Sequence, residues 1–274
     1  MTRRLLVGAT AADPANAVVI WNAVRRWFVE HGMPIEYALY STYDAMGEAL
    51  LSGELDIAWN APMAHVQCLA RSEGRCRTLA MRDTDADSHT VIVARADSGI
   101  GSVDDLRGAR LALGVETSSE LFLIPVTQLR EDGLDPTTDC EAVELEPREY
   151  SDLKRWVDDT AIFDAIVGGV ADAGAIFEPW LAHLIRRRRL EPEDFVEVWR
   201  SRPFCHCAFT AGPQLDPAIA DRFVEILLSM DPSDPNVADM MKREHLTRWV
   251  TADSSGWADL TAAVEQAGLV GETF

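Results

Sequence analysis

Three consecutive hydroxyl side chains, Thr117, Ser118 and Ser119, stand where a strand-like apolar run gives way to a segment with helical periodicity. The first N–H groups of a helix have no backbone acceptor, and the helix dipole favours negative charge beside them. The position of these hydroxyls therefore indicates a local binding site for a small anion. An ordinary Ser/Thr N-cap would give the same pattern without a ligand, and the residues alone leave both interpretations open.

Polar residues also follow two other strand-like segments. Ser41, Thr42 and Tyr43 follow one of them. Asn60 and Ala61 end another, directly before a proline that can begin a helix. Open α/β sheets bind ligands beyond the carboxyl ends of their strands, so we expect these residues to contact a ligand. Tyr43 could donate a hydrogen bond to an oxyanion or, alternatively, cover the edge of the core.

Several titratable side chains stand near predicted strand ends. His65 lies one turn into the helix predicted after Asn60, and His89 precedes a strand-like run. Phe177 and Glu178 end a further strand. A histidine titrates near neutral pH, and a carboxylate can accept a proton or bind an amine, so these groups could bind a ligand or transfer a proton. The alternatives are structural histidines and a carboxylate that stabilises a helix start.

The segment Cys205-His206-Cys207 is the tightest group among the five cysteines, which show no C-x-x-C spacing and are expected to be reduced. On a strand the two cysteines face one side and His206 the other. We therefore expect neither a Cys–His nucleophile pair nor a compact metal site, and we predict no metal and no cofactor. Buried structural cysteines are one interpretation, and a reactive or ligand-contacting thiol is the other.

Strand-like and helix-like segments alternate along the chain, which predicts an α/β fold with helices on both faces of its sheets. The predicted strands are Arg4–Ala9, Ile35–Tyr40, Asp56–Trp59, Arg77–Met81, Val91–Ala94, Arg110–Gly114, Glu141–Leu145, Ala173–Phe177, Phe195–Trp199 and Cys207–Thr210. The predicted helices are 14–31, 44–51, 62–71, 118–131, 153–168, 179–189, 217–230, 237–248 and 256–268.

One sequence pattern occurs twice. A-x-x-x-G-x-x-D followed by a short apolar strand runs from Ala49 to Ala58 and again from Ala165 to Gly174, and each copy leads to a proline-started helix. Two unrelated α/β connections could look alike by chance. The matching spacing favours equivalent elements in two related lobes.

Composition excludes some partners. The chain of 274 residues has a formal net charge of −20, which repels nucleic acid and anionic membranes. No run approaches the roughly 20 apolar residues that span a bilayer. The sequence begins Met1-Thr2-Arg3-Arg4 and shows no signal peptide, so as it stands we expect a cytoplasmic protein, or an extracytoplasmic one if a signal has been removed.

Several motifs resemble a known family. Tyr43…Ala49-Leu50-Leu51-Ser52-Gly53-Glu54-Leu55-Asp56-Ile57-Ala58-Trp59-Asn60-Ala61-Pro62 is similar to the Y-x5-AL-x2-G-x2-DIAW-x-GP run of the phosphate/phosphite/phosphonate (PhnD-like) substrate-binding family of ABC transporters. The rest of the resemblance lies in four segments: Ser102-Val103-Asp104-Asp105-Leu106-Arg107-Gly108, Thr117-Ser118-Ser119, the second copy of the repeated pattern at Gly169–Gly174, and Leu215-Asp216-Pro217.

This resemblance implies the two-lobed type 2 periplasmic-binding-protein (transferrin-like) fold, in which each lobe is a mixed sheet flanked by helices. Lobe one would comprise residues 1–92 and 206–274 and lobe two residues 93–205, with crossovers near 91–96 and 205–211. The ligand would lie in a cleft between the lobes. The ligand-binding residues are then expected at the positions discussed above: Ser41, Thr42, Tyr43, Asn60, Ala61, His65, Thr117, Ser118, Ser119, Phe177, Glu178 and His206.

Two functions fit the resemblance. The first is a protein that closes on a small anion such as a phosphonate, phosphate ester, sulfonate or carboxylate, with an ABC permease as partner if it is exported. The sequence departs from the family at Glu120, where glycine is usual, and at His65, where tyrosine is usual. The second is a cytosolic enzyme on the same fold with lyase- or dehydratase-like acid–base chemistry, for which His65, Glu178, His89 and Cys205 are the catalytic candidates.

Overall fold

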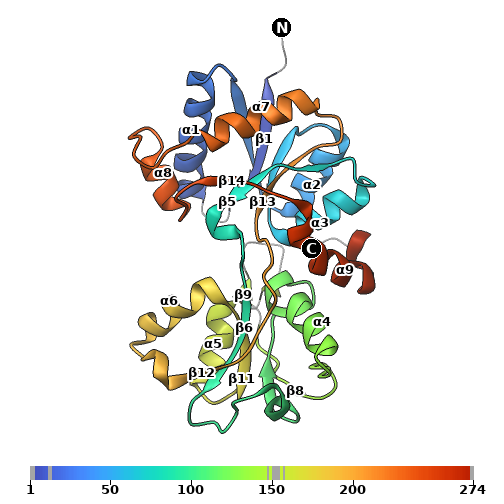
Figure 1. Cartoon of the computed structure of the whole chain (residues 1–274), viewed down its shortest axis with the longest axis vertical. Helices are drawn as coiled ribbons and strands as arrows, with labels where there is room; N and C mark the ends of the chain where they lie inside the picture. Colours follow the sequence, from blue (N-terminus) through green and yellow to red (C-terminus); the bar gives the residue numbers. More distant parts are fainter. Residues whose placement is uncertain (1–3, 12–13, 147, 150–154, 157, 272–274) are drawn as a thin grey trace. The chain divides into compact units, whose positions relative to one another are not determined.

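The computed structural model describes residues 4–11, 14–146, 148–149, 155–156 and 158–271 (Figure 1). The chain divides into two compact units. Unit 1 comprises residues 1–87, 205–261 and 268–274, and unit 2 comprises residues 88–204 and 262–267. The chain therefore leaves unit 1 after Asp87 and returns to it at Cys205.

Unit 1 is built on a mixed five-stranded sheet in the order β2-β1-β3-β13-β4. β1 runs parallel to β2 and β3, whereas β13 runs antiparallel to β3 and β4. The elements are β1 (Leu5–Thr10), α1 (Pro14–Glu30), β2 (Ile35–Tyr40), α2 (Tyr43–Ser52), β3 (Ile57–Asn60), α3 (Pro62–Arg71), β4 (Arg77–Thr78), β5 (Ala80–Arg82), β13 (Ala208–Ala211), α7 (Pro217–Leu228), α8 (Ala238–Arg243) and β14 (Trp249–Thr251). β5 and β14 pair in a separate two-stranded sheet.

Helices cover both faces of the unit 1 sheet because adjacent strand residues point to opposite sides. In β3, Ile57 packs with α1, α7 and α8, whereas Ala58 packs with α2 and α3. The buried stripe of α1 recurs every three or four residues and includes Trp27 and Phe28. Phe28 stacks on Phe223 of α7 with ring centroids 4.7 Å apart, so α1 and α7 share one core.

Unit 2 is built on a second mixed five-stranded sheet in the order β12-β6-β11-β7-β8. Its elements are β6 (Thr90–Arg95), β7 (Arg110–Ala112), α4 (Ile124–Glu131), β8 (Glu141–Ala142), β11 (Ala173–Phe177), α5 (Asp159–Val167), α6 (Glu178–Arg188) and β12 (Phe195–Arg200). Short strands β9 (Arg148–Glu149) and β10 (Arg155–Trp156) pair separately. The last α-helix among the described residues is α9 (Ala258–Gln266).

Both faces of the unit 2 sheet are also buried. Val91 and Val93 of β6 pack with α5 and α6, whereas Ile92 and Ala94 pack with α4 and its surroundings. This explains why β6 is continuously apolar rather than alternating. The mixed α/β class, with each sheet flanked by helices, is confirmed.

The repeated sequence pattern forms equivalent connections in the two units. In unit 1, Asp56 donates its N–H to the carbonyl of Leu6 (3.1 Å) and accepts the N–H of Leu6 at Oδ2 (2.8 Å). In unit 2, Asp172 makes the same two bonds with Arg110, at 2.8 and 2.9 Å. Each aspartate thus fixes the strand that follows it against a neighbouring parallel strand.

Two helix predictions need correction. The helix expected from Leu153 begins at Asp159, because Arg155 and Trp156 belong to β10 and Asp158 caps the helix by accepting the N–H of Ala161 at 2.8 Å. Residues 153 and 154 lie outside the described residues. The helix expected over 237–248 ends at Arg243, and the chain continues into β14.

Candidate functional site

Ser41, Thr42 and Tyr43 lie at the carboxyl end of β2, where α2 begins. Thr42 is the N-cap of α2 and accepts the N–H of Ala45 at Oγ1 (3.2 Å). Ser41 is exposed. Tyr43 is half-buried against the core beneath α2 and borders a small pocket formed with α3. The exposed hydroxyl of Ser41 and the first turn of α2 are accessible parts of this edge.

Asn60 and Ala61 lie at the carboxyl end of β3, before α3. Asn60 is fully buried and donates a hydrogen bond from Nδ2 to Oγ1 of Thr210 (2.9 Å). Its Oδ1 has no hydrogen-bond partner among the described residues. Ala61 precedes Pro62 at the helix start and gives no side-chain cap. Asn60 therefore belongs to a buried polar network rather than to an accessible surface.

His65 lies at the centre of this network. Its side chain is fully buried, Nδ1 lies 2.7 Å from Oγ1 of Thr210, and Nε2 lies 3.1 Å from Oγ1 of Thr78. Its ring packs on Trp257 with centroids 4.5 Å apart. Burial lowers the pKa of His65 to about 3. A histidine with this pKa stays neutral at physiological pH, which argues against proton transfer by His65 near neutral pH.

In unit 2, Thr117, Ser118 and Ser119 form a helix start, as expected. Ser118 accepts the N–H of Leu121 at Oγ (3.2 Å), so this hydroxyl acts as the N-cap. The first turn, Ser119–Leu123, is a π-helix that continues into α4. Ser119 is buried and Thr117 is half-buried. The cap and the anion-site interpretations are therefore compatible, because they use different hydroxyls.

Two carboxylates stand beside this helix start. Glu120 lies in its first turn, and its carbonyl accepts a 2.6 Å hydrogen bond from Thr90. Asp159 begins α5 and accepts the N–H of Phe177 at Oδ1 (2.7 Å). Burial, together with the negative charge of Glu120, raises the pKa of Asp159 to about 7.

Asp159 was missed by the sequence reasoning. The pair Asp158-Asp159 directly before an apolar periodic run is an N-cap signal. The helix prediction that began six residues earlier, at Leu153, hid this signal. The structure thus adds an acid of unusual pKa to the edge that carries Thr117–Ser119.

His89, Phe177 and Glu178 lie at the same end of the unit 2 sheet. Glu178 begins α6 and donates its N–H to the carbonyl of His89 (2.9 Å). The Nδ1 atom of His89 lies 2.8 Å from the carbonyl oxygen of Ser201. Arg200 lies 3.0 Å from Oε1 of Glu178. A ligand amine at Glu178 would therefore compete with the guanidinium of Arg200. The ring of Phe177 packs near that of Phe204, with centroids 6.2 Å apart.

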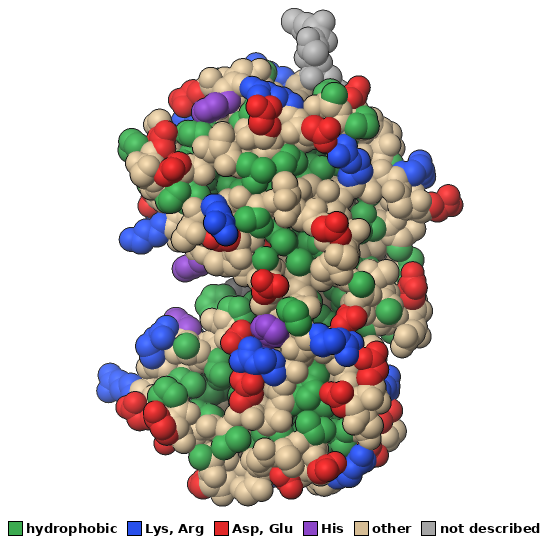
Figure 2. Space-filling model, viewed as in Figure 1, with side chains coloured by type: hydrophobic (Ala, Val, Ile, Leu, Met, Phe, Trp, Pro, Cys, Tyr) green, Lys and Arg blue, Asp and Glu red, His purple; other side chains and the backbone are tan. Residues whose placement is uncertain are grey.

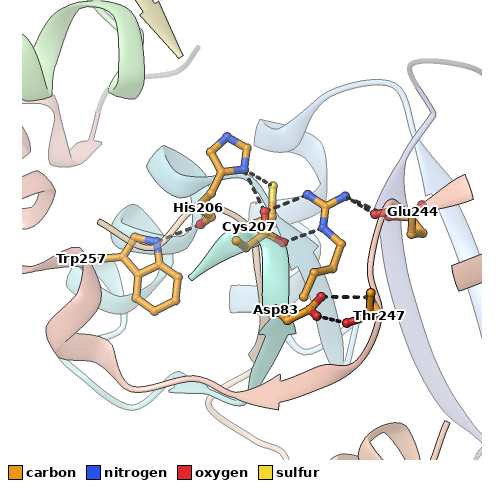
Figure 3. A network of polar contacts seen from close by, with 8 residues as sticks. Asp83, His206, Cys207, Glu244, Thr247 and Trp257 are labelled. Atoms are coloured by element: carbon orange, nitrogen blue, oxygen red, sulfur yellow. Dashed lines mark hydrogen bonds and ion pairs between the residues drawn. The ribbon is translucent and has the colours of Figure 1, made fainter. Parts of the chain in front are cut away.

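The expectation that His206 faces away from Cys205 and Cys207 on a strand is wrong for Cys207. Residues 205–207 precede β13 and are not paired as a strand, so the alternation of side chains does not apply. Sγ of Cys207 lies 3.1 Å from Nδ1 of His206, and the same nitrogen lies 3.2 Å from Oδ1 of Asp85 (Figure 3). Sequence reasoning gave no signal for Asp85.

Ligand atoms converge at this place. In the part of the chain that the structure describes, Asp85, His206 and Cys207 are the one group of three His, Cys, Asp or Glu side chains with ligand atoms within 4.8 Å of one another. However, Arg82 engages both carboxylate oxygens of Asp85, at 2.5 Å from Nε and 2.8 Å from Nη2. A positive charge is therefore already in place, and we assign no metal to this group.

The predicted site residues thus form separate local groups. The structure brings Asn60 and His65 together inside unit 1, and Thr117–Ser119 together with Glu120 and Asp159 in unit 2. On the face shown in Figure 2, acidic and basic side chains are interspersed rather than gathered into one positive patch.

Comparison with known proteins identifies the family. The model for periplasmic substrate-binding proteins of phosphonate ABC transporters matches residues 8–257. The chain belongs to this family. It is 25% identical over 213 residues to the phosphate-import protein PhnD of Mycolicibacterium smegmatis, a match that covers 75% of this chain and 63% of the length of that relative.

Solved structures show the same fold. PhnD1 from Prochlorococcus marinus in complex with methylphosphonate has a TM-score of 0.69 at 15% identity, with 97% of this chain and 98% of that chain covered. XAC2383 from Xanthomonas citri bound to ATP has a TM-score of 0.72 at 21% identity, covering 98% and 99%. The aliphatic sulphonate binding protein SsuA from Escherichia coli has a TM-score of 0.62 at 14% identity, covering 99% and 90%.

Membership in the phosphonate-binding family supports a substrate-binding protein over the enzyme alternative. The structural neighbours are two-lobed periplasmic binding proteins. No helix in the described ranges combines the length and apolar character needed to cross a bilayer.

Proposed function

We propose that this protein is the extracytoplasmic substrate-binding component of an ABC importer and that it delivers a small oxyanion to a permease. Family membership and the names of the similar proteins, which bind or import phosphonate, phosphate and sulphonate, support this ligand class. The observation on this chain that carries the proposal is the helix start at Thr117–Ser119.

The helix start offers a binding site for the oxyanion. Ser118 is occupied by its own capping bond, whereas Thr117 and Ser119 flank it with hydroxyls that can donate to ligand oxygens. The N–H groups of the first turn and the helix dipole add to this local positive potential. Ser41 and Tyr43 remain candidates for ligand contact at the edge of the unit 1 sheet.

The two acids narrow the ligand class. Glu120 and Asp159 would repel a dianion such as methylphosphonate, and each could pair with an ammonium group. We therefore propose an oxyanion that also carries an amine, such as an aminoalkylphosphonate. Asp159 rather than Glu178 is the amine partner, because Arg200 already pairs with Glu178.

Calorimetric titration tests this proposal with 2-aminoethylphosphonate, methylphosphonate, ethanesulfonate and inorganic phosphate as ligands. We expect Ser119→Ala and Thr117→Val each to weaken binding about tenfold, since hydrogen bonds to charged groups contribute about 1.5–3 kcal/mol. Ser118→Ala should mainly lower stability, by about 1 kcal/mol, through the lost cap. Unchanged affinity in both Thr117→Val and Ser119→Ala would refute the oxyanion site.

Asp159→Asn separates the two ligand types. We expect it to weaken binding of 2-aminoethylphosphonate and to strengthen binding of methylphosphonate, because only the first ligand carries a cation. Glu193→Gln, which removes an exposed carboxylate from the same unit, is the matched control and should change neither. Mass analysis of the recovered ligand checks for turnover, and an altered mass would favour the enzyme alternative.

A further inference from the structure

The two segments that connect the units pair with each other. Ser88 and Phe204 form an antiparallel bridge, with each N–H donating to the carbonyl of the other at 2.9 Å. One step further, His206 donates its N–H to the carbonyl of Asp85 at 2.8 Å. The backbone around residues 205–207 is thereby held in place before β13 begins.

This backbone fixes a thiol, an imidazole and a carboxylate around one atom. Nδ1 of His206 lies 3.1 Å from Sγ of Cys207 and 3.2 Å from Oδ1 of Asp85 (Figure 3). Nε1 of Trp257 donates to the carbonyl of His206 at 2.9 Å and anchors the residue from its other side. A single nitrogen therefore faces both the thiol and the carboxylate. With the ring proton on Nε2, Nδ1 can accept the thiol hydrogen, and the imidazolium that results can donate from Nδ1 to Asp85.

The charges around the group support an ionised carboxylate. Although burial favours the neutral acid, hydrogen bonds from Arg82 and His206 hold the pKa of Asp85 below its ordinary value. Glu244 binds the far side of the same guanidinium at 3.1 Å, and burial raises the pKa of Glu244. Asp85 can therefore stabilise a positive charge on His206 when the imidazole accepts the proton of Cys207.

The other four cysteines lie in environments that favour the protonated thiol. Burial raises the pKa of Cys68 to about 12 and that of Cys140 and Cys205 to about 11, and it also raises the pKa of Cys76. The acids near Cys205 add to its shift. Cys205 is only two residues from Cys207 and provides an internal comparison, because burial and nearby acids raise the pKa of its thiol.

We propose that Cys207 is a nucleophilic thiol and a site of covalent modification by small disulfides. His206 takes the thiol proton, and Sγ attacks one sulfur of the disulfide. The S–S bond breaks, a mixed disulfide forms on Cys207, and the leaving thiolate takes the proton from His206. Asp85 is a positioning residue whose carboxylate accepts the Nδ1–H of the imidazolium formed in this step.

Access limits the reagent. Cys207 is only 8% exposed, and the side chain of His206 is 20% exposed. A small neutral disulfide therefore fits this site better than a protein partner does.

Timed labelling of the folded chain with iodoacetamide or bis(2-hydroxyethyl) disulfide, followed by peptide mass analysis, tests the proposal. We expect Cys207 to react at least tenfold faster than Cys205 at pH 7.5. His206→Gln should slow labelling of Cys207 at least tenfold and make its rate rise more steeply with pH. Cys207→Ser should abolish the fast phase, whereas Cys205→Ser, the matched control, should keep it.

Circular dichroism checks that each variant is folded. A second variant, Asp85→Asn, tests the positioning role of the carboxylate. It should also make labelling of Cys207 more dependent on pH, which a purely structural loss would not do. Labelling of all five cysteines at one common rate would show that the reagent enters only through unfolding, and would overturn the proposal. A rate at Cys207 that His206→Gln leaves unchanged would overturn it as well.

Discussion

The buried imidazole of His65 should make the folded protein sensitive to mild acid. Its pKa is lowered to about 3 by burial, whereas an unfolded chain holds the histidine at its ordinary value of about 6.5. The unfolded state therefore binds the proton first as the pH falls. Stability contributed by this difference is fully present above pH 6.5 and is lost progressively as the pH falls toward 3.

The size of the loss follows from the two pKa values. From pH 8 to pH 5 the free energy of unfolding falls by about 2 kcal/mol, because each pH unit below the unfolded-state pKa of about 6.5 lowers it by about 1.36 kcal/mol. Replacing His65 with glutamine removes this titration. The variant should be less stable at pH 8 by about 1–3 kcal/mol, because contacts with Thr78, Thr210 and Trp257 are disturbed.

Urea unfolding at pH 8 and pH 5, followed by circular dichroism, measures the difference. The deficit of His65→Gln relative to the unmodified chain should shrink by about 2 kcal/mol at pH 5. Other groups titrate equally in both proteins and cancel in the comparison. His183→Gln is the matched control, because His183 is exposed on α6, and it should lower stability much less than His65→Gln. A constant deficit for His65→Gln would refute the assignment of a neutral buried histidine.

Three further changes test other parts of the fold by thermal or urea unfolding. Gly256→Ala should cost about 1–3 kcal/mol, because the new Cβ would lie 2.2 Å from Sγ of Cys205, and Cys205→Ala should recover much of this loss; no recovery would contradict the packing. Asp159→Asn should raise stability by about 1 kcal/mol at pH 8, where the buried carboxyl must ionise in the folded state. The gain should be smaller at pH 5, because a folded-state pKa of about 7 leaves the carboxyl largely protonated there. The partial exposure of Asp159 makes the expected gain smaller than the full pKa shift implies. Asp56→Ala should lower stability by about 1–3 kcal/mol through the lost bond to Leu6, whereas the exposed neighbour change Glu54→Ala should have little effect.

Local patterns in the sequence predict much of the fold. Helices α2, α3 and α7 begin at or within one residue of the predicted positions, because a cap or an early proline marks each start. The repeated aspartates Asp56 and Asp172 make equivalent bonds because spacing between helix and strand is a local property. Family motifs then connect these elements to a known fold.

Side-chain environments depend on distant segments and could not be predicted in the same way. His65 is neutral because Thr210, 145 residues away, and Trp257 enclose it. Cys207 meets His206 because pairing of β13 begins one residue later than expected, which removes the strand alternation. In both cases the residue type was noticed, but its chemistry is set by partners that no local pattern reveals.

The insertion of β13 between β3 and β4 has a consequence for synthesis on the ribosome. The sheet of unit 1 cannot be completed until Ala208–Ala211 has emerged, although β1, β2 and β3 are made first. All five strands of the unit 2 sheet lie before residue 201 and can pair earlier. The nascent chain therefore carries an unpaired edge of β3 while its middle portion folds, which makes that edge the place where a chaperone would protect it from mispairing.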